Sequence, residues 1–235
     1  MPKPITLLKA ALFAAALVPF GLLVWGFYTN DLTANPGDYI TDQTGTWILG
    51  TLFASLCITP LRKLTGWNDL IKLRRMLGLF AFFYATLHLL TWIVFVNYFD
   101  VTSMVADVFK RPFITVGMTV FVNYFDVPSM VADVFKRPFI TVGMAVFIIL
   151  FLLAITSNRW SIRLLARKWA TLHRLVYLAA IGGVIHFWWL VKADITLPRR
   201  WAVAFGVLLG VRAWWAYQKR VTTSSTRRVA AAGGR

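Results

Sequence analysis

The residues of this chain that could do chemistry are its three histidines, His88, His173 and His186. His88 lies in the apolar run 76–95, and the other two lie in the run 168–189. Both runs are apolar enough to be membrane helices, where a histidine is costly and rarely without a function. His173 and His186 would lie roughly 20 Å apart along a helix, near opposite edges of a hydrocarbon layer about 30 Å thick. Two redox centres that span a membrane would be spaced in this way.

Each histidine also has a simpler explanation, as a polar side chain hydrogen-bonded across a helix interface. Together they fit iron ligation by neutral imidazole better, because all nine acidic residues are Asp and fall outside the apolar runs. A proton pump would need carboxylates within the membrane, and a transporter would need broken helices in two corresponding halves. Haem held between helices is a recurrent use of a bundle core. Gly182 and Gly183 would provide either a flat surface for a porphyrin or a helix-packing contact.

The composition excludes a soluble globular domain. Of 235 residues, 59% are hydrophobic and 14% are charged, and the mean hydropathy is +0.67, which predicts an all-α integral membrane protein. The net charge of +16 would suit nucleic acid, but Lys and Arg cluster at the ends of apolar runs and mark membrane topology instead. We therefore expect a lipid bilayer and no nucleic acid as partner. The single Cys57 excludes an internal disulfide and a thiolate-held iron–sulfur cluster.

Six apolar runs predict a bundle of six transmembrane helices, at residues 5–28, 45–61, 76–95, 139–156, 170–191 and 201–215. The second is expected to stop at Pro60 and the basic pair that follows. Residues 1–217 would form the membrane domain, and the Ser-, Thr- and Arg-rich segment 218–235 would form a disordered basic tail. Inner segments would hold most of the 25 Lys and Arg residues and a single acid, Asp69. This positive-inside pattern predicts that both termini are cytoplasmic.

The segment 94–119 is repeated as 120–145, with differences only at Thr102 versus Pro128 and Thr119 versus Ala145. This is a tandem duplication with a period of 26 residues. Each copy contains an amphipathic helix suited to a membrane surface. Only the second copy continues into an apolar run long enough to span. An additional span would turn the basic connection 159–168 outward, so we expect 97–138 to be an enlarged outer loop.

Several motifs along the chain are similar to those of one family. The MsrQ (YedZ) family, within the ferric-reductase-like transmembrane superfamily, consists of haem-binding membrane subunits of periplasmic methionine sulfoxide reductase systems. The resemblance runs from the first helix to the last, and its most specific element is Trp-x-x-Leu-His-x-x-Val-Tyr with a second His thirteen residues later. The motifs are Arg74-Arg-Met-Leu-Gly-Leu79, Ala85-Thr-Leu-His88, Arg137-Pro138, Ala154-Ile-Thr-Ser157, Lys168-Trp-x-x-Leu-His173-Arg-Leu-Val-Tyr177 and His186-Phe-x-Trp189.

The resemblance implies one or two b-type haems, FMN, and a location in the bacterial inner membrane. Electrons would come from the quinone pool or a flavin reductase and pass to a periplasmic molybdopterin-containing methionine sulfoxide reductase subunit, similar to MsrP. The chain would be an electron-transfer subunit rather than the catalytic one. No flavin or nicotinamide fingerprint is present in the sequence, so FMN rests on the resemblance alone. The duplication is not a feature of that family, and either copy alone would restore an ordinary helix spacing.

Arg74 precedes His88 by fourteen residues, on nearly the same helical face, where ferric-reductase domains usually have another histidine. It is either a basic anchor at the inner interface or a partner for a haem propionate. The helix depths pair His88 with His186 as axial ligands of one outer haem iron, and leave His173 for a second, inner haem or for none. Thirteen residues rotate a side chain by about 220°, so His173 and His186 cannot both face the third helix without a distortion.

Three classes of function are therefore open. The first is an electron-transfer subunit whose partner performs the substrate chemistry. The second is a stand-alone transmembrane ferric or flavin reductase, against which the lack of a nucleotide-binding domain in this sequence counts. The third is a non-redox membrane protein with packing histidines. An absorbance spectrum separates the third class from the other two.

Overall fold

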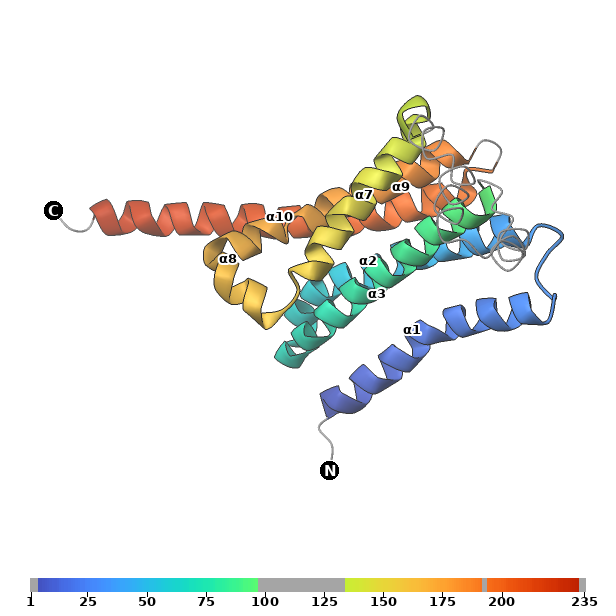
Figure 1. Ribbon diagram of the computed structural model, residues 1–235. Coiled ribbons are helices and arrows are strands. Elements are labelled where there is room, and N and C mark those ends of the chain that lie inside the picture. The colour runs from blue at the N-terminus through green and yellow to red at the C-terminus, as the bar shows by residue number, and fades with distance from the viewer. Residues whose placement is uncertain (1–3, 97–133, 192–193, 233–235) are drawn as a thin grey trace.

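The computed structural model describes residues 4–96, 134–191 and 194–232, and within these ranges it contains helices and no strands. Two short irregular helices flank α3, a 3₁₀ turn at Asn68–Leu70 and a π-helical turn at Trp92–Val96. The longer helices are α1 (Pro4–Tyr28), α2 (Pro36–Thr65), α3 (Ile71–Thr91), α7 (Pro138–Ile155), α8 (Arg159–Leu172), α9 (Leu175–Leu190) and α10 (Thr196–Ala232). Figure 1 shows α2, α3, α7, α9 and the first half of α10 side by side, with α1 along one flank.

The helices confirm the prediction of an all-α membrane protein. Among the described residues, four helical segments are long and apolar enough to cross a membrane, at Pro4–Tyr28, Pro36–Thr65, Asn68–Val94 and Pro138–Ile155. The bent pair α8 and α9, at 49° to each other, makes a fifth if it counts as one span. The predicted sixth span lies within α10, which is not among these segments. The six-span arrangement therefore stays a prediction.

α2 is longer than predicted at both ends. Its start is fixed by Asn35, whose side chain accepts a hydrogen bond from the Asp38 N–H, and by Pro36 in the first turn, both of which favour a helix N-terminus. Pro60 does not end the helix, contrary to the prediction. The helix ends instead at Gly66, which has a φ of 70° and donates its N–H to the Arg62 carbonyl, because glycine adopts this left-handed conformation without a steric penalty.

The basic connection predicted at 159–168 is the helix α8. Asn158 caps it by accepting a hydrogen bond of 2.7 Å from the Ser161 N–H. The backbone leaves helical geometry at Ala166 and breaks again before α9 begins at Leu175. The predicted fifth span, 170–191, therefore starts later than expected. His173 lies at the break between α8 and α9 rather than inside a straight helix.

α10 continues far beyond the membrane-helix residues predicted at 201–215. The segment after residue 218, predicted to be a disordered tail, is helical as far as Ala232. The sequence has no proline after Pro198 and no glycine between Gly210 and Gly233, so no strong helix breaker interrupts it. The second half of α10 extends away from the bundle (Figure 1).

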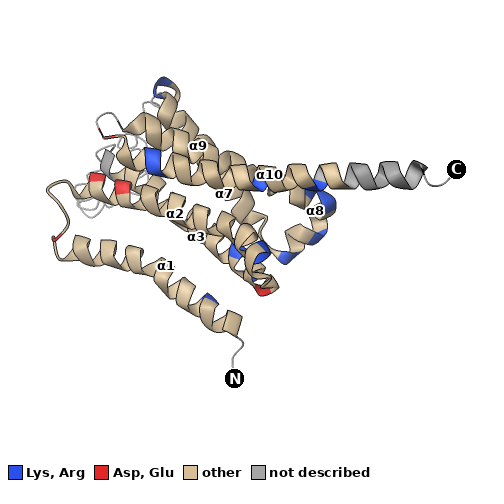
Figure 2. Cartoon of the chain, turned by 180° about the vertical axis from the view of Figure 1, so that it is seen from behind, with Lys and Arg blue, Asp and Glu red and all other residues tan. Residues whose placement is uncertain are grey.

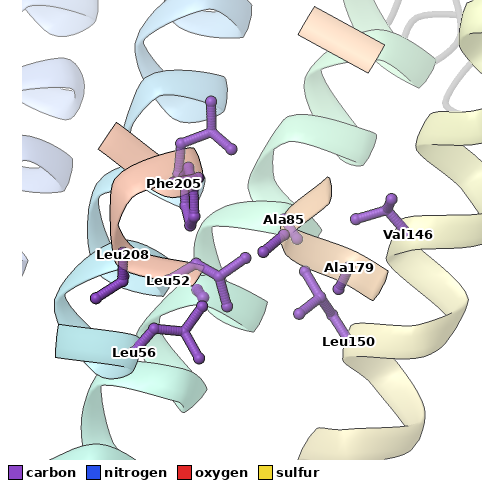
Figure 3. Packing of buried hydrophobic residues seen from close by; sticks show 11 residues of the cluster. Leu52, Leu56, Ala85, Val146, Leu150, Ala179, Phe205 and Leu208 are labelled. Atoms are coloured by element: carbon purple, nitrogen blue, oxygen red, sulfur yellow. The ribbon is translucent and has the colours of Figure 1, made fainter. Parts of the chain in front are cut away.

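The core lies where five helices meet. Leu52 and Leu56 of α2 are at most 1% exposed, and the alanines at this contact, such as Ala81 and Ala179, let the helices approach closely. Figure 3 shows the side chains of α2, α3, α7, α9 and α10 converging on this centre. The buried cluster consists of Leu49, Leu52, Leu56, Ala81, Ala85, Val146, Leu150, Ala179, Ala180, Phe205 and Leu208.

The two ends of the bundle differ in charge. Figure 2 shows Lys and Arg gathered around the α2–α3 connection and on α8, whereas the Asp residues of α2 lie at the opposite end, near further Lys and Arg. Asp38 and Asp42 occupy the first turns of α2, which is helical from Pro36 onward. Of the duplicated region, 97–133 lies outside the described residues. Its predicted surface helices and outer location are therefore not tested by the structure.

Candidate functional site

Two of the three histidines meet at the end of the bundle opposite the basic connections. His88 lies in the last turn of α3 and His186 near the end of α9. Their ring centres are 6.1 Å apart and their planes are inclined at 85°. Both histidines lie on a cavity whose other walls come mainly from the first half of α2 and from α7. The structure thus brings together His88 and His186, the two histidines that the sequence predicts to lie at a similar depth in the membrane.

The cavity between these helices has a volume of about 490 Å³, within the range of small-molecule and cofactor sites. Most of its lining is apolar, including Ile48, Leu49, Phe147 and Leu150. Its polar lining residues are Asp38, Thr41, Asp42, His88, Arg137 and His186. A flat apolar group with a polar edge would match these walls.

Both histidines are held through the same ring atom. The Nδ1 atom of His88 is 3.0 Å from the Thr41 carbonyl oxygen and 3.3 Å from the Thr44 hydroxyl. The Nδ1 atom of His186 is 2.6 Å from the Phe139 carbonyl oxygen. A backbone carbonyl can only accept a hydrogen bond, so Nδ1 must carry the proton in each ring. This tautomer leaves the lone pair on Nε2, and that atom can therefore bind a metal.

The spacing of the two rings suits one metal ion between them. Imidazoles bound to a metal from opposite sides, each through a bond of about 2 Å, have ring centres roughly 6 Å apart. In the described part of the chain, neither Nε2 atom has a hydrogen-bond partner. No group of three or more His, Cys, Asp or Glu side chains there could hold a metal ion. Two imidazoles with unprotonated Nε2 atoms are what a protein contributes to an iron whose other ligands belong to a porphyrin.

The two central glycines of α9 have different surroundings. Gly183 lines the cavity, and a Cβ atom there would lie 3.2 Å from Leu49. Gly182 faces α7, where a Cβ atom would lie 2.7 Å from Val146. Of the two roles considered for this pair, Gly183 therefore fits the surface of the cavity, and Gly182 fits helix packing.

His173 lies apart from the other two histidines. Its ring stacks on Trp169 with centres 4.1 Å apart, and its Nε2 atom is 3.2 Å from the Thr156 hydroxyl. The Trp169 indole donates a hydrogen bond of 3.0 Å to the Thr156 carbonyl. His173 thus faces the junction of α7, α8 and α9, and it does not line the cavity that holds His88 and His186.

Arg74 lies in the first half of α3, towards the basic end, and interacts with the Tyr177 hydroxyl. Arg212 of α10 also donates a hydrogen bond to that hydroxyl, and another, of 2.8 Å, to the Leu56 carbonyl. Two guanidinium groups therefore share one phenol near the basic end. Sequence reasoning selected Arg74 but missed Arg212, although a single arginine inside an apolar run is itself a signal of function.

The sequence of this chain is similar to that of a known family of membrane proteins. Residues 44–184 match the family described as the ferric reductase like transmembrane component. A relative from Herminiimonas arsenicoxydans, named protein-methionine-sulfoxide reductase heme-binding subunit MsrQ, is 46% identical over 93% of this chain and 90% of its own length. Proteins of the same name from Ralstonia nicotianae and Bordetella pertussis are each 40% identical, over 99% and 88% of this chain and 94% and 90% of their own lengths.

The chain belongs to the MsrQ family. The resemblance found in the sequence motifs is thereby confirmed. The region that matches the ferric-reductase family contains His88 and His173 and ends two residues before His186. No solved structure matches the chain.

Proposed function

We propose that the chain is a b-type haem-binding electron-transfer subunit of a methionine sulfoxide reductase system in the bacterial inner membrane. The observation that carries this proposal is the pair His88 and His186, whose spacing and tautomers suit two axial ligands of one iron. The relatives are named as heme-binding subunits of such a reductase, which supports the same cofactor here.

The residues of the chain have separate roles in this proposal. Bound haem supplies a one-electron carrier. His88 and His186 would hold the iron, and the Thr41 and Phe139 carbonyls keep each ring in the tautomer that leaves Nε2 free to bind it. The apolar walls exclude water from the site and thereby influence its potential.

The direction of electron flow follows from the charges at the two ends. Lys and Arg gather at the end with α8 (Figure 2), which the positive-inside rule assigns to the cytoplasm. The histidine pair is then on the periplasmic side, where Asp38 and Asp42 lie at the cavity. We infer that electrons leave there for a periplasmic molybdopterin-containing, MsrP-like subunit. Its docking surface would include residues 30–43 and the loop 97–138.

This orientation includes six spans, with α10 as the sixth and both termini in the cytoplasm. Cysteine labelling tests it after the native thiol is removed by Cys57→Ala. A cysteine introduced by Ser129→Cys should react with an impermeant reagent from outside the cell, and one introduced by Ser224→Cys should not. The opposite pattern would refute the orientation.

Electron entry is expected at the inner end, from the quinone pool or a flavin reductase. Arg74 and Arg212 lie together there, and two cations could hold a carboxylate or phosphate group of a cofactor. His173 would serve a second haem at this end, or none. A pyridine haemochrome assay with a protein determination distinguishes one haem per chain from two. FMN is proposed on family resemblance alone, and flavin fluorescence of a heat-released supernatant tests it.

The function as a whole is tested with purified protein, a quinol and the periplasmic reductase. We expect a low-spin b-type absorbance spectrum, reduction of the haem by the donor, and reoxidation only when the reductase and methionine sulfoxide are both present. Protein that is folded and free of haem would contradict the proposal. Reoxidation by ferric chelates alone, without effect of the reductase, would favour a stand-alone ferric reductase.

A further inference from the structure

We propose that Gly143 and Gly45 are positioning residues for the histidine pair. Because each glycine has no side chain, one imidazole can lie against it and reach the backbone carbonyl that orients the ring. The inference rests on the proposed haem site and extends it to two residues of neighbouring helices. Gly143 belongs to α7 and faces His186, and Gly45 belongs to α2 and faces His88.

The clearance is smallest at Gly143. A Cβ atom on this residue would lie 2.7 Å from Cε1 and 2.8 Å from Nδ1 of His186. These distances are far below a normal carbon contact of about 3.5–4.0 Å, so a methyl group would have to displace the ring. A Cβ atom on Gly45 would lie 3.4 Å from Cε1 and 3.5 Å from Nδ1 of His88, which is ordinary contact.

Each glycine lies four residues after the backbone carbonyl that its histidine contacts, and this spacing explains why both positions face an imidazole. His186 donates to the carbonyl of Phe139, four residues before Gly143, and His88 donates to the carbonyl of Thr41, four residues before Gly45. In an α-helix the carbonyl of residue i points along the axis towards residue i+4. A ring that reaches this carbonyl from a neighbouring helix must therefore pass over the surface of residue i+4. A side chain at that position limits how closely the ring approaches, already at Cβ for Gly143 and only beyond Cβ for Gly45.

The hydrogen bond and the glycine act on the same imidazole in two ways. The carbonyl fixes which ring nitrogen carries the proton, and the glycine fixes how closely the ring approaches the carbonyl. His186 has both the shorter hydrogen bond, at 2.6 Å against 3.0 Å, and the tighter glycine contact. Substitution of Gly143 should therefore disturb the site more than the same substitution of Gly45.

The α7–α9 interface provides a matched control. A Cβ atom on Gly182 would also meet a neighbour at 2.7 Å, but this neighbour is the Val146 side chain, which lines the cavity and cannot bind a metal. Gly143→Ala and Gly182→Ala thus impose clashes of equal distance between the same two helices. Only the first clash involves a proposed ligand, so a merely structural effect would appear in both variants.

The experiment compares Gly143→Ala, Gly182→Ala and Gly210→Ala in the full chain, since a Cβ atom on Gly210 would meet nothing within 4 Å. Folding is followed by size-exclusion chromatography, and the site by haem content, spin state and midpoint potential. We expect Gly143→Ala to lose low-spin haem or to bind haem on the order of 10- to 100-fold more weakly, as for other outer-shell changes. Gly182→Ala and Gly210→Ala should keep the wild-type spectrum and potential.

A folded Gly143→Ala variant with wild-type haem content, spin state and potential would overturn the inference. So would an equal loss of haem in Gly182→Ala. If Gly143→Ala does not fold, the pair Gly45→Ala and Gly45→Val decides. Alanine should be tolerated, and valine, whose γ carbons extend further towards His88, should displace the ligand. A wild-type protein without haem would instead refute the proposed function, so the two failures are distinguishable.

Discussion

The imidazole planes of His88 and His186 are nearly perpendicular, at 85° to each other. Each plane is set by a different helix, because His88 donates to a carbonyl of α2 and His186 to a carbonyl of α7. The orientation is therefore a property of the fold and not of two freely rotating side chains.

This relationship predicts the electron paramagnetic resonance spectrum of the oxidised protein. Perpendicular axial imidazoles interact almost equally with the two iron d orbitals that they can reach, which leaves these orbitals close in energy. We expect a highly anisotropic low-spin ferric signal from the outer haem. A rhombic low-spin signal, typical of parallel imidazole planes, would contradict the geometry.

Tyr84 connects α3 to α1. Its side chain is fully buried and its hydroxyl donates a hydrogen bond of 2.6 Å to the Ala16 carbonyl. Tyr84→Phe should lower the free energy of unfolding by about 0.5–1.5 kcal/mol, because it removes this buried hydrogen bond. Thermal unfolding in detergent measures this loss. Tyr28→Phe, at a residue that is 83% exposed, is the control and should have little effect.

Tyr177 joins the two arginines at the basic end of the bundle. Tyr177→Phe removes the hydroxyl that Arg74 and Arg212 share, and hydrogen bonds to charged groups contribute roughly 1.5–3 kcal/mol. We expect reduced thermal stability with no change in the low-spin spectrum of the outer haem, since Tyr177 does not line that cavity. Tyr217→Phe, on the exposed part of α10, is the matched control. A change in the spectrum of the outer haem would contradict the separation of the two ends.

The duplication should be dispensable for the histidine pair. Deletion of residues 94–119 removes one copy and keeps Phe139, Gly143 and both histidines. The deletion variant should retain the haem content and low-spin spectrum of the full chain, as absorbance and a haemochrome assay would show. Loss of haem from a folded deletion variant would mean that the first copy contributes to the site.

Much of this arrangement could be predicted from the sequence. The pairing of His88 with His186 could be predicted from the depth of each histidine relative to the basic residues that flank its helix. The angle between the side chains of His173 and His186 along one helix points the same way. Both quantities can be read from one helical segment at a time. Helix ends were less predictable, because Pro60 is accommodated inside α2 and Gly66 supplies the actual stop. The sequence does not predict α8, because a segment as rich in basic residues as 159–168 is typical of a loop between two membrane helices.

The surroundings of the histidines could not be predicted in the same way. Thr41 and Phe139 contribute backbone carbonyls, which have no signature in the sequence. Gly45 and Gly143 matter only because of the helices that pack against them. The arginine at 212 did carry a signal, a cation within an apolar run, but its partner Tyr177 depends on how α9 and α10 pack.

We propose that His88 and His186 ligate one haem and that His173 does not. The most direct measurement is the low-spin absorbance spectrum, normalised to folded protein, of His88→Ala, His186→Ala and His173→Ala. His88→Ala and His186→Ala should each abolish the same low-spin signal, because each removes one of two ligands to the same iron. His173→Ala should leave that signal largely in place. Loss of the signal in His173→Ala with retention in His186→Ala would contradict the account.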